Sequence, residues 1–551
     1  MKTIQATEEQ LAIVEESEKG TDVILVNAFA GTGKTTTCFL VIEKLIKKGK
    51  RILYLVFNKS AAEDAKKKAK NLGLLQKNLE ISTVHAYAYK RLKKANQLKG
   101  KNFGALKVKT VADKFHKIFN YSKKDYNKIF WVVEFFNHFL YSKFNWDEIE
   151  DFITYKIEKS KKFRTGYDLL GEEFLITSIK HLILLINEGL IEMPHDFYLK
   201  KYVFSDLINE PYDLVILDES QDANPLFIEF LKKLKTKQIL LVGDKHQRIY
   251  QFRNTIDAFN YYKEGKIFYL TQSFRFTEDI AEKANLILNF KGEIQKLRGV
   301  KEPNHKFKNI AFIGYTNSAI LQKYLTLSPK EKDYAMFERP IEEILKPILT
   351  ICVFREKKNP SDLKLPIDYS LINSFQNYQD LEFYIKEIEN LYINKNDKKE
   401  KEEEEENFLS EKELLQAYIL SKQFNVEEIE NLYRQYKNAE HNEKHIYLST
   451  AHAAKGLEYN EVYLLKDLAI QKKFLEHFLN QYSQNIEADL NLLYVAVTRA
   501  SKKIDYGFDL IETFNNIKML SEEKKEQQQG LFSIIEMKEN KSLSEKLKRK
   551  I

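Results

Sequence analysis

The stretch DVILVNAFAGTGKTT, residues 22–36, decides the fold. Residues 22–28 form a continuous apolar run, which is typical of a parallel strand buried on both faces. A glycine-rich turn follows, and the chain then continues at 35–49 as TTTCFLVIEKLIKKG, a helical pattern. A strand, a glycine turn and a helix in this order predict an α/β domain built on a parallel sheet.

The turn itself matches a phosphate-binding loop, except that Ala28 stands where the pattern has its first glycine. Gly31 and Gly33 let backbone N–H groups point into an anion cradle at the helix N-terminus. Lys34 can reach the β- and γ-phosphates, and the Thr35 hydroxyl can ligate Mg²⁺. The alternative is a turn that needs glycine for geometry alone, and the flanking strand and helix favour the phosphate loop.

An acidic pair follows a second apolar strand, YDLVIL at 212–217. Asp218 can hold Mg²⁺, and Glu219 can align or deprotonate a water for attack on the γ-phosphate. An acidic pair can also mark a helix N-terminus. With the phosphate loop upstream, the pair instead predicts nucleotide hydrolysis with Mg²⁺ as its cofactor.

Other apolar runs extend the α/β pattern along the chain. Strand candidates of the first set lie at 51–57, 79–82, 238–243 and 267–270, and those of a second set at 309–314, 445–449, 461–465 and 503–508. Residues 86–195 are helical in pattern and dense in Phe, Tyr and Lys, which predicts an insertion. A second insertion, 351–440, contains the charge run KKEKEEEEEN at 398–407, which predicts a solvated loop.

The composition excludes several other classes of protein. The chain has 551 residues, 43% of them apolar and 30% charged, with only 18 Gly and 9 Pro, which excludes collagen and wholesale disorder. Its net charge of +8 is mild. Cys38 and Cys352 cannot build a disulfide framework. With no secretory signal pattern and no apolar run near 20 residues, we expect a cytoplasmic protein without membrane contact.

The acidic motif Asp-Glu-x-Gln-Asp at 218–222 resembles helicase superfamily 1 of the UvrD/Rep type. The family's other motifs occur in its order, at 7–10, 57–63, 82–85, 243–253, 272–276, 449–458 and 491–500. Within the family, Ser-Phe-Arg-Phe at 273–276 and Met-Pro-His-Asp-Phe-Tyr-Leu-Lys at 193–200 resemble the F-box DNA helicase branch and its bacterial relatives.

The resemblance implies an α/β fold of two tandem RecA-like P-loop NTPase domains with helical insertions. The expected parts are core domain 1 at 1–85 and 196–270, a 1B-like insertion at 86–195, core domain 2 at 271–350 and 441–515, a reduced 2B-like insertion at 351–440, and a polar tail at 516–551.

The resemblance also implies an ATP site. Gln10 would pair with the adenine edge, Phe274 would stack on the base, and Gln247 would sense the γ-phosphate. The expected catalytic residues are Lys34, Asp218, Glu219, Gln247, Arg275 and Arg499. The expected nucleotide contacts are Gln10, Ala28, Ala30, Gly31, Thr32, Gly33, Lys34, Thr35, Thr36, Phe274 and Glu458, and the expected metal ligands are Thr35 and Asp218. Thr36 stands where several relatives carry Arg near the adenine, so the resemblance leaves one base contact open.

On the nucleic-acid side, the resemblance implies movement 3′→5′ on single-stranded DNA or a tailed duplex. The expected DNA contacts are Phe57, Asn58, Thr83, His85, Tyr250, Phe252, Arg253, Thr450 and His452. Aromatic side chains there would stack on bases without reading sequence, and the alternative for each is ordinary core. The stretch 90–128 holds thirteen Lys or Arg, which suits phosphate contact or a merely solvated face.

Three alternatives stay open. The chain could be a DNA-stimulated ATPase switch subunit of a larger nuclease or defence complex, a superfamily 1 RNA helicase, or a non-catalytic DNA-binding protein. Partners beyond DNA would be a nuclease and a sliding clamp. Gln528, Leu531 and Phe532 fit the clamp-binding pattern Gln-x-x-Leu-Phe, and the alternative is one turn of a packed C-terminal helix.

Overall fold

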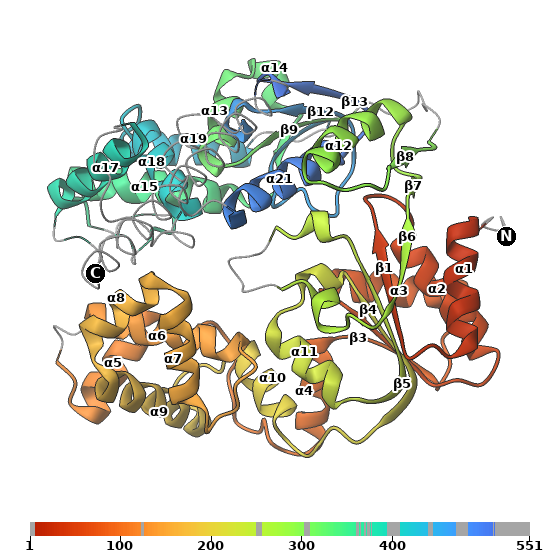
Figure 1. Ribbon diagram of the computed structural model, residues 1–551. Helices are drawn as coiled ribbons and strands as arrows, with labels where there is room; N and C mark the ends of the chain where they lie inside the picture. Colours follow the sequence, from red (N-terminus) through yellow and green to blue (C-terminus); the bar gives the residue numbers. More distant parts are fainter. Residues whose placement is uncertain are drawn as a thin grey trace, which may run out of the picture. The chain divides into compact units, whose positions relative to one another are not determined.

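The computed structural model describes residues 6–122, 126–249, 256–301, 309–359, 363, 365–368, 371, 375, 377–393, 408–438, 445–469, 483–510 and 512. The chain divides into two compact units (Figure 1). Unit 1 comprises Met1–Asn289 and Glu293–Asn304, and unit 2 comprises Phe290–Gly292 and His305–Ile551.

Unit 1 is built on a six-stranded, fully parallel sheet in the order β3-β2-β4-β5-β1-β6. Its strands are β1 (Val23–Ala28), β2 (Ile52–Val56), β3 (Leu79–Thr83), β4 (Pro211–Asp218), β5 (Lys235–Gly243) and β6 (Lys266–Leu270). Because β4, β5 and β1 are adjacent and parallel, their carboxyl ends lie together at one end of the sheet. This sheet confirms the predicted α/β class.

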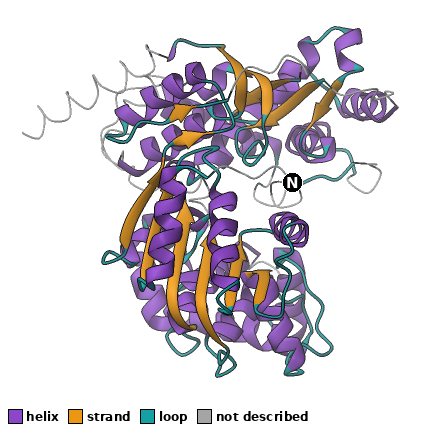
Figure 2. Cartoon of the chain, turned by 90° about the vertical axis from the view of Figure 1, so that its right-hand side faces the viewer, coloured by secondary structure: helices purple, strands orange, loops and turns teal. Residues whose placement is uncertain are grey.

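Helices cover both faces of this sheet (Figure 2). On β1, Ile24 and Val26 pack into one core cluster, whereas Leu25 belongs to another, as alternation along a strand requires. The first cluster includes side chains of α1 (Glu8–Lys19), α2 (Lys34–Ile46) and α3 (Lys59–Asn71). The second includes those of α4 (Val84–Lys94), α10 (His195–Val203) and α11 (Pro225–Lys233).

Helices fill the described part of 86–195, where the sequence predicts an insertion. After α4 they are α5 (Val108–Phe119), α6 (Tyr126–Tyr141), α7 (Ile149–Lys159), α8 (Lys161–Leu170) and α9 (Glu172–Glu188), drawn in orange to yellow in Figure 1. The phenylalanines of this segment form its core, because Phe135, Phe136, Phe139, Phe152 and Phe163 are all buried. Their aromatic pairs explain why the segment is so rich in Phe.

Unit 2 has a parallel five-stranded sheet in the order β10-β11-β9-β12-β13. Its strands are β9 (Ile310–Gly314), β10 (Ala335–Phe337), β11 (Ile446–Thr450), β12 (Tyr459–Leu464) and β13 (Ala500–Tyr506). Its helices are α13 (Asn317–Thr326), α14 (Pro329–Lys332), α15 (Ile341–Glu356), α17 (Tyr378–Ile393), α18 (Phe408–Ser421), α19 (Val426–Asn438) and α21 (Ser483–Val497). Short 3₁₀ turns are η2 (Ser220–Asp222), η3 (Lys245–Gln247) and η5 (Ala258–Tyr261) in unit 1 and η7 (Lys466–Leu468) in unit 2.

The segment after β6 differs from the expected organisation, which starts the second core domain at residue 271. It forms β7 (Gln272–Ser273), β8 (Arg298–Gly299) and α12 (Glu278–Phe290), and apart from Phe290–Gly292 it clusters with unit 1. Hydrogen bonds explain this placement, since the Phe274 N–H donates to the Gly31 carbonyl over 2.9 Å. The other expected boundaries stay predictions.

In the part of the chain that the structure describes, no helix has both the length and the apolar character needed to span a bilayer.

Candidate nucleotide-binding site

The loop between β1 and α2 has the geometry of an anion cradle. Gly31 and Gly33 adopt φ values of 75° and 85°, a region that side chains other than glycine rarely occupy. A Cβ on Gly31 would also overlap Ser273 Oγ and Arg275 Cβ, so this position requires glycine for space as well. Thr32 braces the loop by donating its hydroxyl to the Phe29 carbonyl over 2.8 Å. Ala28 and Ala30 are fully buried, so their apolar side chains pack beneath the loop.

Lys34, the first residue of α2, forms an ion pair with Glu219. Its Nζ lies 2.8 Å from Glu219 Oε2. Burial acts to lower the pKa of Lys34, but the negative charges of Glu219, Asp244 and Asp218 outweigh burial and raise the pKa. The ammonium therefore keeps its charge at neutral pH, where it can attract a phosphate.

Asp218, the last residue of β4, is buried and surrounded by donors. Its Oδ2 accepts from the Tyr54 hydroxyl over 2.7 Å and from the Thr35 hydroxyl over 3.3 Å, and its Oδ1 accepts from the Glu219 N–H over 2.9 Å. Burial and the neighbouring Glu219 raise the pKa of Asp218, while Lys34 and Tyr54 oppose that rise.

The residues fit Mg²⁺, which prefers oxygen ligands and keeps several waters and phosphate oxygens in its coordination sphere. Thr35 and Asp218 bring a hydroxyl and a carboxylate within 3.3 Å of each other. The described residues contain no cluster of three or more His, Cys, Asp or Glu that could hold a metal. One carboxylate and one hydroxyl are the few protein ligands that Mg²⁺ typically takes when it also binds nucleotide phosphates.

Gln221 connects the acidic pair to the next motif. Its Nε2 donates to Glu219 Oε2 over 2.5 Å, and its Oε1 accepts from the Asp244 N–H over 3.0 Å. The Asp244 carboxylate in turn accepts from Gln247 Nε2 over 2.7 Å. A hydrogen-bond chain thus runs from Glu219 to Gln247, two of the expected catalytic residues.

The expected adenine contacts converge on Gly33. A Cβ built there would lie 3.1 Å from Gln10 Nε2, 3.8 Å from Thr36 Cβ and 4.0 Å from Phe274 Cδ2. Phe274 is 47% exposed, which leaves its ring available for stacking. Gln10 is only 2% exposed and already serves the fold, since its amide accepts from the Thr7 N–H in a capping box and donates to Thr37.

Arg275 belongs to unit 1, although the sequence places it in the second core domain. The same segment begins at Thr271, whose N–H and hydroxyl both donate to the Glu9 carboxylate, over 2.8 and 2.5 Å. Residues 271–275 are therefore fixed between α1 and the phosphate-binding loop, and they bring Arg275 beside Gly31.

Unit 2 holds Arg499 and Glu458. Arg499 is 1% exposed, and its guanidinium donates to the Val495 and Leu457 carbonyls and to the Thr498 hydroxyl over 2.9 to 3.2 Å. Glu458 is exposed just before β12. The arginine is thus part of the internal packing of unit 2 as well as a candidate catalytic group.

Four expected DNA contacts lie near the carboxyl ends of β2 and β3. Phe57 follows β2 and is half-buried, and Asn58 caps α3 by accepting from the Ala61 N–H over 2.8 Å. Thr83 caps α4 in the same way, and His85 Nε2 lies 2.9 Å from Asp196 Oδ1. Asn58 and Thr83 therefore have a structural role as helix caps, which the sequence motifs alone do not reveal.

Of the remaining expected DNA contacts, some lie in unit 2 and the others lie outside the described residues. In unit 2, Thr450 ends β11 and His452 follows it, with its ring centroid 6.3 Å from that of Tyr315. Tyr250, Phe252 and Arg253 lie outside the described residues, as do the charge run at 398–407 and the tail residues Gln528, Leu531 and Phe532.

In the basic stretch 90–128, Arg91 is committed to the fold rather than presented to a polyanion. Its guanidinium donates to Glu80 and Glu210 over 2.7 to 3.1 Å and lies 3.3 Å from the centroid of the Tyr87 ring. Lys90 is exposed, and its Nζ lies 3.8 Å from Oε1 of the same Glu80.

Sequence reasoning missed three residues that contact the expected site. Tyr54 donates to Asp218, Glu9 holds Thr271, and Lys68 Nζ donates to the Thr36 hydroxyl over 3.0 Å. The signal for Tyr54 was a polar group within the apolar strand RILYLVF. Glu9 lies in the motif at 7–10, but nothing local indicated its own role, and Lys68 gave no local signal, because the partners of both residues are distant in the sequence.

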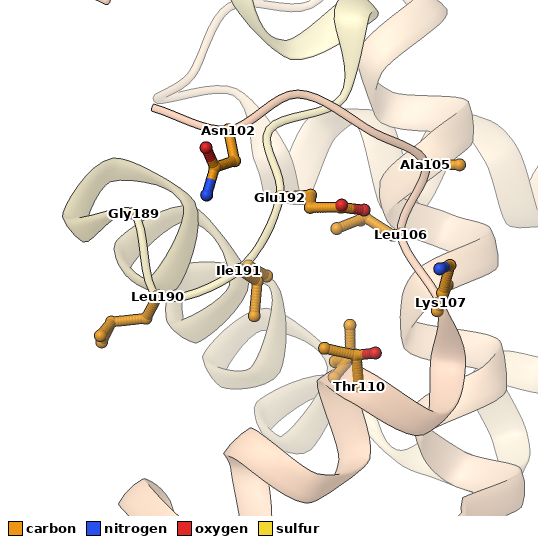
Figure 3. A pocket seen from close by; sticks show the side chains of 10 residues that line it. Asn102, Ala105, Leu106, Lys107, Thr110, Gly189, Leu190, Ile191 and Glu192 are labelled. Atoms are coloured by element: carbon orange, nitrogen blue, oxygen red, sulfur yellow. The ribbon is translucent and has the colours of Figure 1, made fainter. Parts of the chain in front are cut away.

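A separate cavity of about 240 Å³ lies in the helical insertion (Figure 3). It is lined by the loop before α5 and the turn after α9, with Asn102, Lys107, Thr110 and Glu192 as its main polar groups. Of the expected site residues, none lines it.

Comparisons with known proteins agree with this geometry. Residues 6–268 match the UvrD/REP helicase N-terminal domain. The chain is 29% identical over 535 residues to F-box DNA helicase protein 1 of Schizosaccharomyces pombe, covering 90% of this chain and 57% of that protein. It is 26% identical over 283 residues to ATP-dependent DNA helicase Rep of Buchnera aphidicola, covering 48% and 42%. It is 30% identical over 125 residues to RecBCD enzyme subunit RecB of Buchnera aphidicola, covering 21% and 11%.

The chain thus spans little more than half the length of the first of these relatives and less of the others. The domain match covers the phosphate-binding loop, the acidic pair and Gln247, which the structure brings together. Parallel, helix-flanked sheets in both units agree with this similarity of residues 6–268 to the UvrD/REP helicase N-terminal domain.

Proposed function

We propose that this chain is an ATP-dependent DNA helicase or translocase, which uses Mg²⁺ and moves 3′→5′ on single-stranded DNA in repair, recombination or genome defence. The observation that carries the proposal is the hydrogen-bonded arrangement of Lys34, Glu219 and Gln247 around the phosphate-binding loop. The direction and the biological setting rest on the family resemblance alone.

The residues of unit 1 suggest how hydrolysis proceeds. A γ-phosphate competes with Glu219 for the Lys34 ammonium, so nucleotide binding frees the carboxylate to orient a water and take its proton. Bound Mg²⁺, held through Thr35 and Asp218, would neutralise charge on the phosphate oxygens. Arg275 and Arg499 would supply planar donors to the charge that develops in the transition state.

The hydrogen-bond chain through Gln221 and Asp244 offers a route from hydrolysis to DNA. A change at Glu219 reaches Gln247, three residues before the expected DNA contact Tyr250. The proposal therefore links the γ-phosphate to the DNA-facing part of the same motif.

ATPase measurements with and without single-stranded DNA test the proposal. Lys34→Ala should reduce turnover by about a hundredfold or more, because it removes a donor to the phosphate, and should leave DNA binding largely intact. Lys44→Ala is the matched control, since this exposed lysine on the same helix pairs only loosely with Glu18 at 3.8 Å. Turnover by Lys34→Ala at the parent rate would show that the phosphate-loop assignment is wrong.

Two further measurements separate DNA from RNA as the polymer. DNA and RNA oligomers of equal length should differ in ATPase stimulation, with DNA the stronger. Affinity for single-stranded DNA should fall with salt at a log–log slope of about −3 to −4, because each phosphate contact releases counterions. Equal stimulation by RNA would favour the RNA helicase alternative.

A second candidate function is an ATPase switch subunit of a nuclease complex. The similarity of 125 residues to a RecBCD enzyme subunit supports this second candidate function. DNA-stimulated ATPase activity without strand separation by the chain alone, and strand separation once a partner nuclease is added, would support it.

Docking of the tail on a sliding clamp is the last part of the proposal. The pattern at Gln528, Leu531 and Phe532 supports it. Leu531→Ala combined with Phe532→Ala should abolish clamp binding and leave DNA-stimulated ATPase unchanged. A lower thermal stability with intact clamp binding would instead indicate a structural tail.

A further inference from the structure

A buried tyrosine reaches the expected metal ligands from the core of the sheet. Tyr54 lies in the middle of β2 and is fully buried, with its ring 5.7 Å from that of Phe39 in an edge-to-face contact. Its hydroxyl lies 2.7 Å from Asp218 Oδ2, the same oxygen that accepts from Thr35.

We propose that Tyr54 is a positioning residue for the divalent cation: its phenol fixes the rotation of the Asp218 carboxylate, so that Asp218 and Thr35 present their oxygens to one ion. The inference rests on the proposed function, because it needs Mg²⁺ to be bound with the nucleotide at these two residues.

The contacts of Asp218 show how the rotation is fixed. One carboxylate oxygen is held by the Glu219 N–H over 2.9 Å and the other by the Tyr54 phenol. A carboxylate anchored at both oxygens cannot turn about its Cβ–Cγ bond without losing a hydrogen bond. Without the phenol, the Thr35 hydroxyl at 3.3 Å is the weaker of the remaining contacts.

The position of Tyr54 argues against a role in packing alone. Ile52, Tyr54 and Val56 face the same core cluster, and the first and last are aliphatic. An aliphatic side chain at 54 would fill the same layer, so the hydroxyl is the feature that packing does not require.

The loss expected on removing the hydroxyl follows from metal sites in general. Residues that orient a metal ligand typically contribute a factor of about 10 to 100 in metal affinity. Tyr54→Phe should therefore raise the half-saturating Mg²⁺ concentration for nucleotide binding by about tenfold or more. Nucleotide affinity in EDTA should stay within twofold of the parent, because the phosphate-binding loop and Lys34 are untouched.

The experiment is a Mg²⁺ titration of a fluorescent ATP analogue bound to the full chain, read as equilibrium affinity rather than turnover. Tyr202→Phe is the matched control, because it also removes a fully buried phenol hydroxyl in unit 1, but one that touches no expected metal ligand. Affinity in EDTA also reports whether each variant is folded, and Tyr54→Phe deletes only one oxygen from the core.

The outcomes are distinct. An unchanged half-saturating Mg²⁺ concentration in Tyr54→Phe overturns the inference. An equal loss of affinity with Mg²⁺ and with EDTA also overturns it, since Tyr54 would then support the loop itself. If the parent chain binds nucleotide without any Mg²⁺ dependence, the proposed metal site fails before the question of Tyr54 arises.

Discussion

At the scale of single residues, Glu219 combines an unusual backbone with a charged side chain. Its φ of 53° and ψ of 42° place a residue other than glycine in the left-handed region, which costs about 1 kcal/mol or more. The conformation turns the chain directly after β4, so that Glu219 faces Lys34 while Asp218 stays buried. Strain of this kind is common at functional sites.

Glu219→Gln should bind nucleotide with Mg²⁺ as the parent does but lose hydrolysis by about a hundredfold or more, because an amide cannot accept the proton of water. The amide oxygen can still accept from Lys34 and Gln221. Equilibrium binding and steady-state ATPase check this, with Glu229→Gln, which only breaks an ion pair with Lys232, as the control. Loss of nucleotide binding in Glu219→Gln would contradict the assigned role.

Arg499→Ala should lower kcat by about a thousandfold or more, with little change in ATP affinity, if the guanidinium meets the transition state. The structure adds a second effect. Three acceptors lose this donor, among them the buried Val495 carbonyl and Thr498 hydroxyl, which should reduce the free energy of unfolding by about 1–3 kcal/mol. Urea unfolding and ATPase kinetics separate the two effects, and a loss confined to KM would contradict the catalytic role.

The residue scale also shows where sequence patterns suffice. The phosphate-binding loop and the acidic pair were predictable because their chemistry is local: glycines at fixed spacing and carboxylates at a strand end. Tyr54, Glu9 and Lys68 were not, because each acts through a partner that the fold alone brings near.

At the scale of elements, hydrogen bonds connect α1 to the segment between β6 and β7. Glu9 accepts two hydrogen bonds from Thr271, and this contact holds the segment that carries Phe274 and Arg275. The motif at 7–10 therefore fixes the segment that carries two expected nucleotide-site residues, in addition to containing Gln10.

A double-mutant cycle tests the contact between Glu9 and Thr271. Glu9→Gln and Thr271→Val should each lower nucleotide affinity several-fold, and their coupling in urea unfolding should be about 1–2 kcal/mol, as for hydrogen bonds to a charged group. Glu8→Gln, the exposed neighbour in the first turn of α1, should change neither. Additive effects of the pair would show that the contact is not energetically coupled.

A pH dependence is expected where α10 meets α6. Lys200 is fully buried, and its Nζ donates to the Phe139 and Ser142 carbonyls over 2.9 and 3.1 Å. Burial lowers the pKa of Lys200 well below its ordinary value. Between that lowered pKa and about 10.4, the unfolded chain holds a proton that the folded chain has released, so stability rises with pH.

The free energy of unfolding of the parent should therefore increase, relative to that of Lys200→Met, between pH 7 and pH 10. Lys232→Met, at an exposed position on α11, should show no such trend. Urea unfolding at both pH values measures the free energy of unfolding of the parent and of Lys200→Met. A difference between the two that does not change with pH would contradict the expectation.

The strands also show which elements a sequence pattern can predict and which it cannot. Long apolar strands such as β1 and β4 were predictable, whereas β10, with three residues, and the two-residue β7 and β8 were not. Elements this short carry no periodicity, and their partners determine them.

At the scale of the whole molecule, the expected site residues are divided between the two units. Unit 1 holds the phosphate-binding loop, both carboxylates and Arg275, and unit 2 holds Arg499, Glu458, Thr450 and His452. The sequence predicted two parallel sheets correctly. It could not predict that 271–289 cluster with unit 1, because that depends on contacts with Glu9 and Gly31.

Strand separation on tailed duplexes tests the central claim most directly. Two duplexes of the same sequence, one with a 3′ tail and one with a 5′ tail on the loading strand, are incubated with the full chain, ATP and Mg²⁺, with Lys34→Ala as the inactive control. The account predicts ATP-dependent separation of the 3′-tailed duplex, little separation of the 5′-tailed one and none by Lys34→Ala. Preferential separation of the 5′-tailed duplex, or separation that continues in Lys34→Ala, would contradict it.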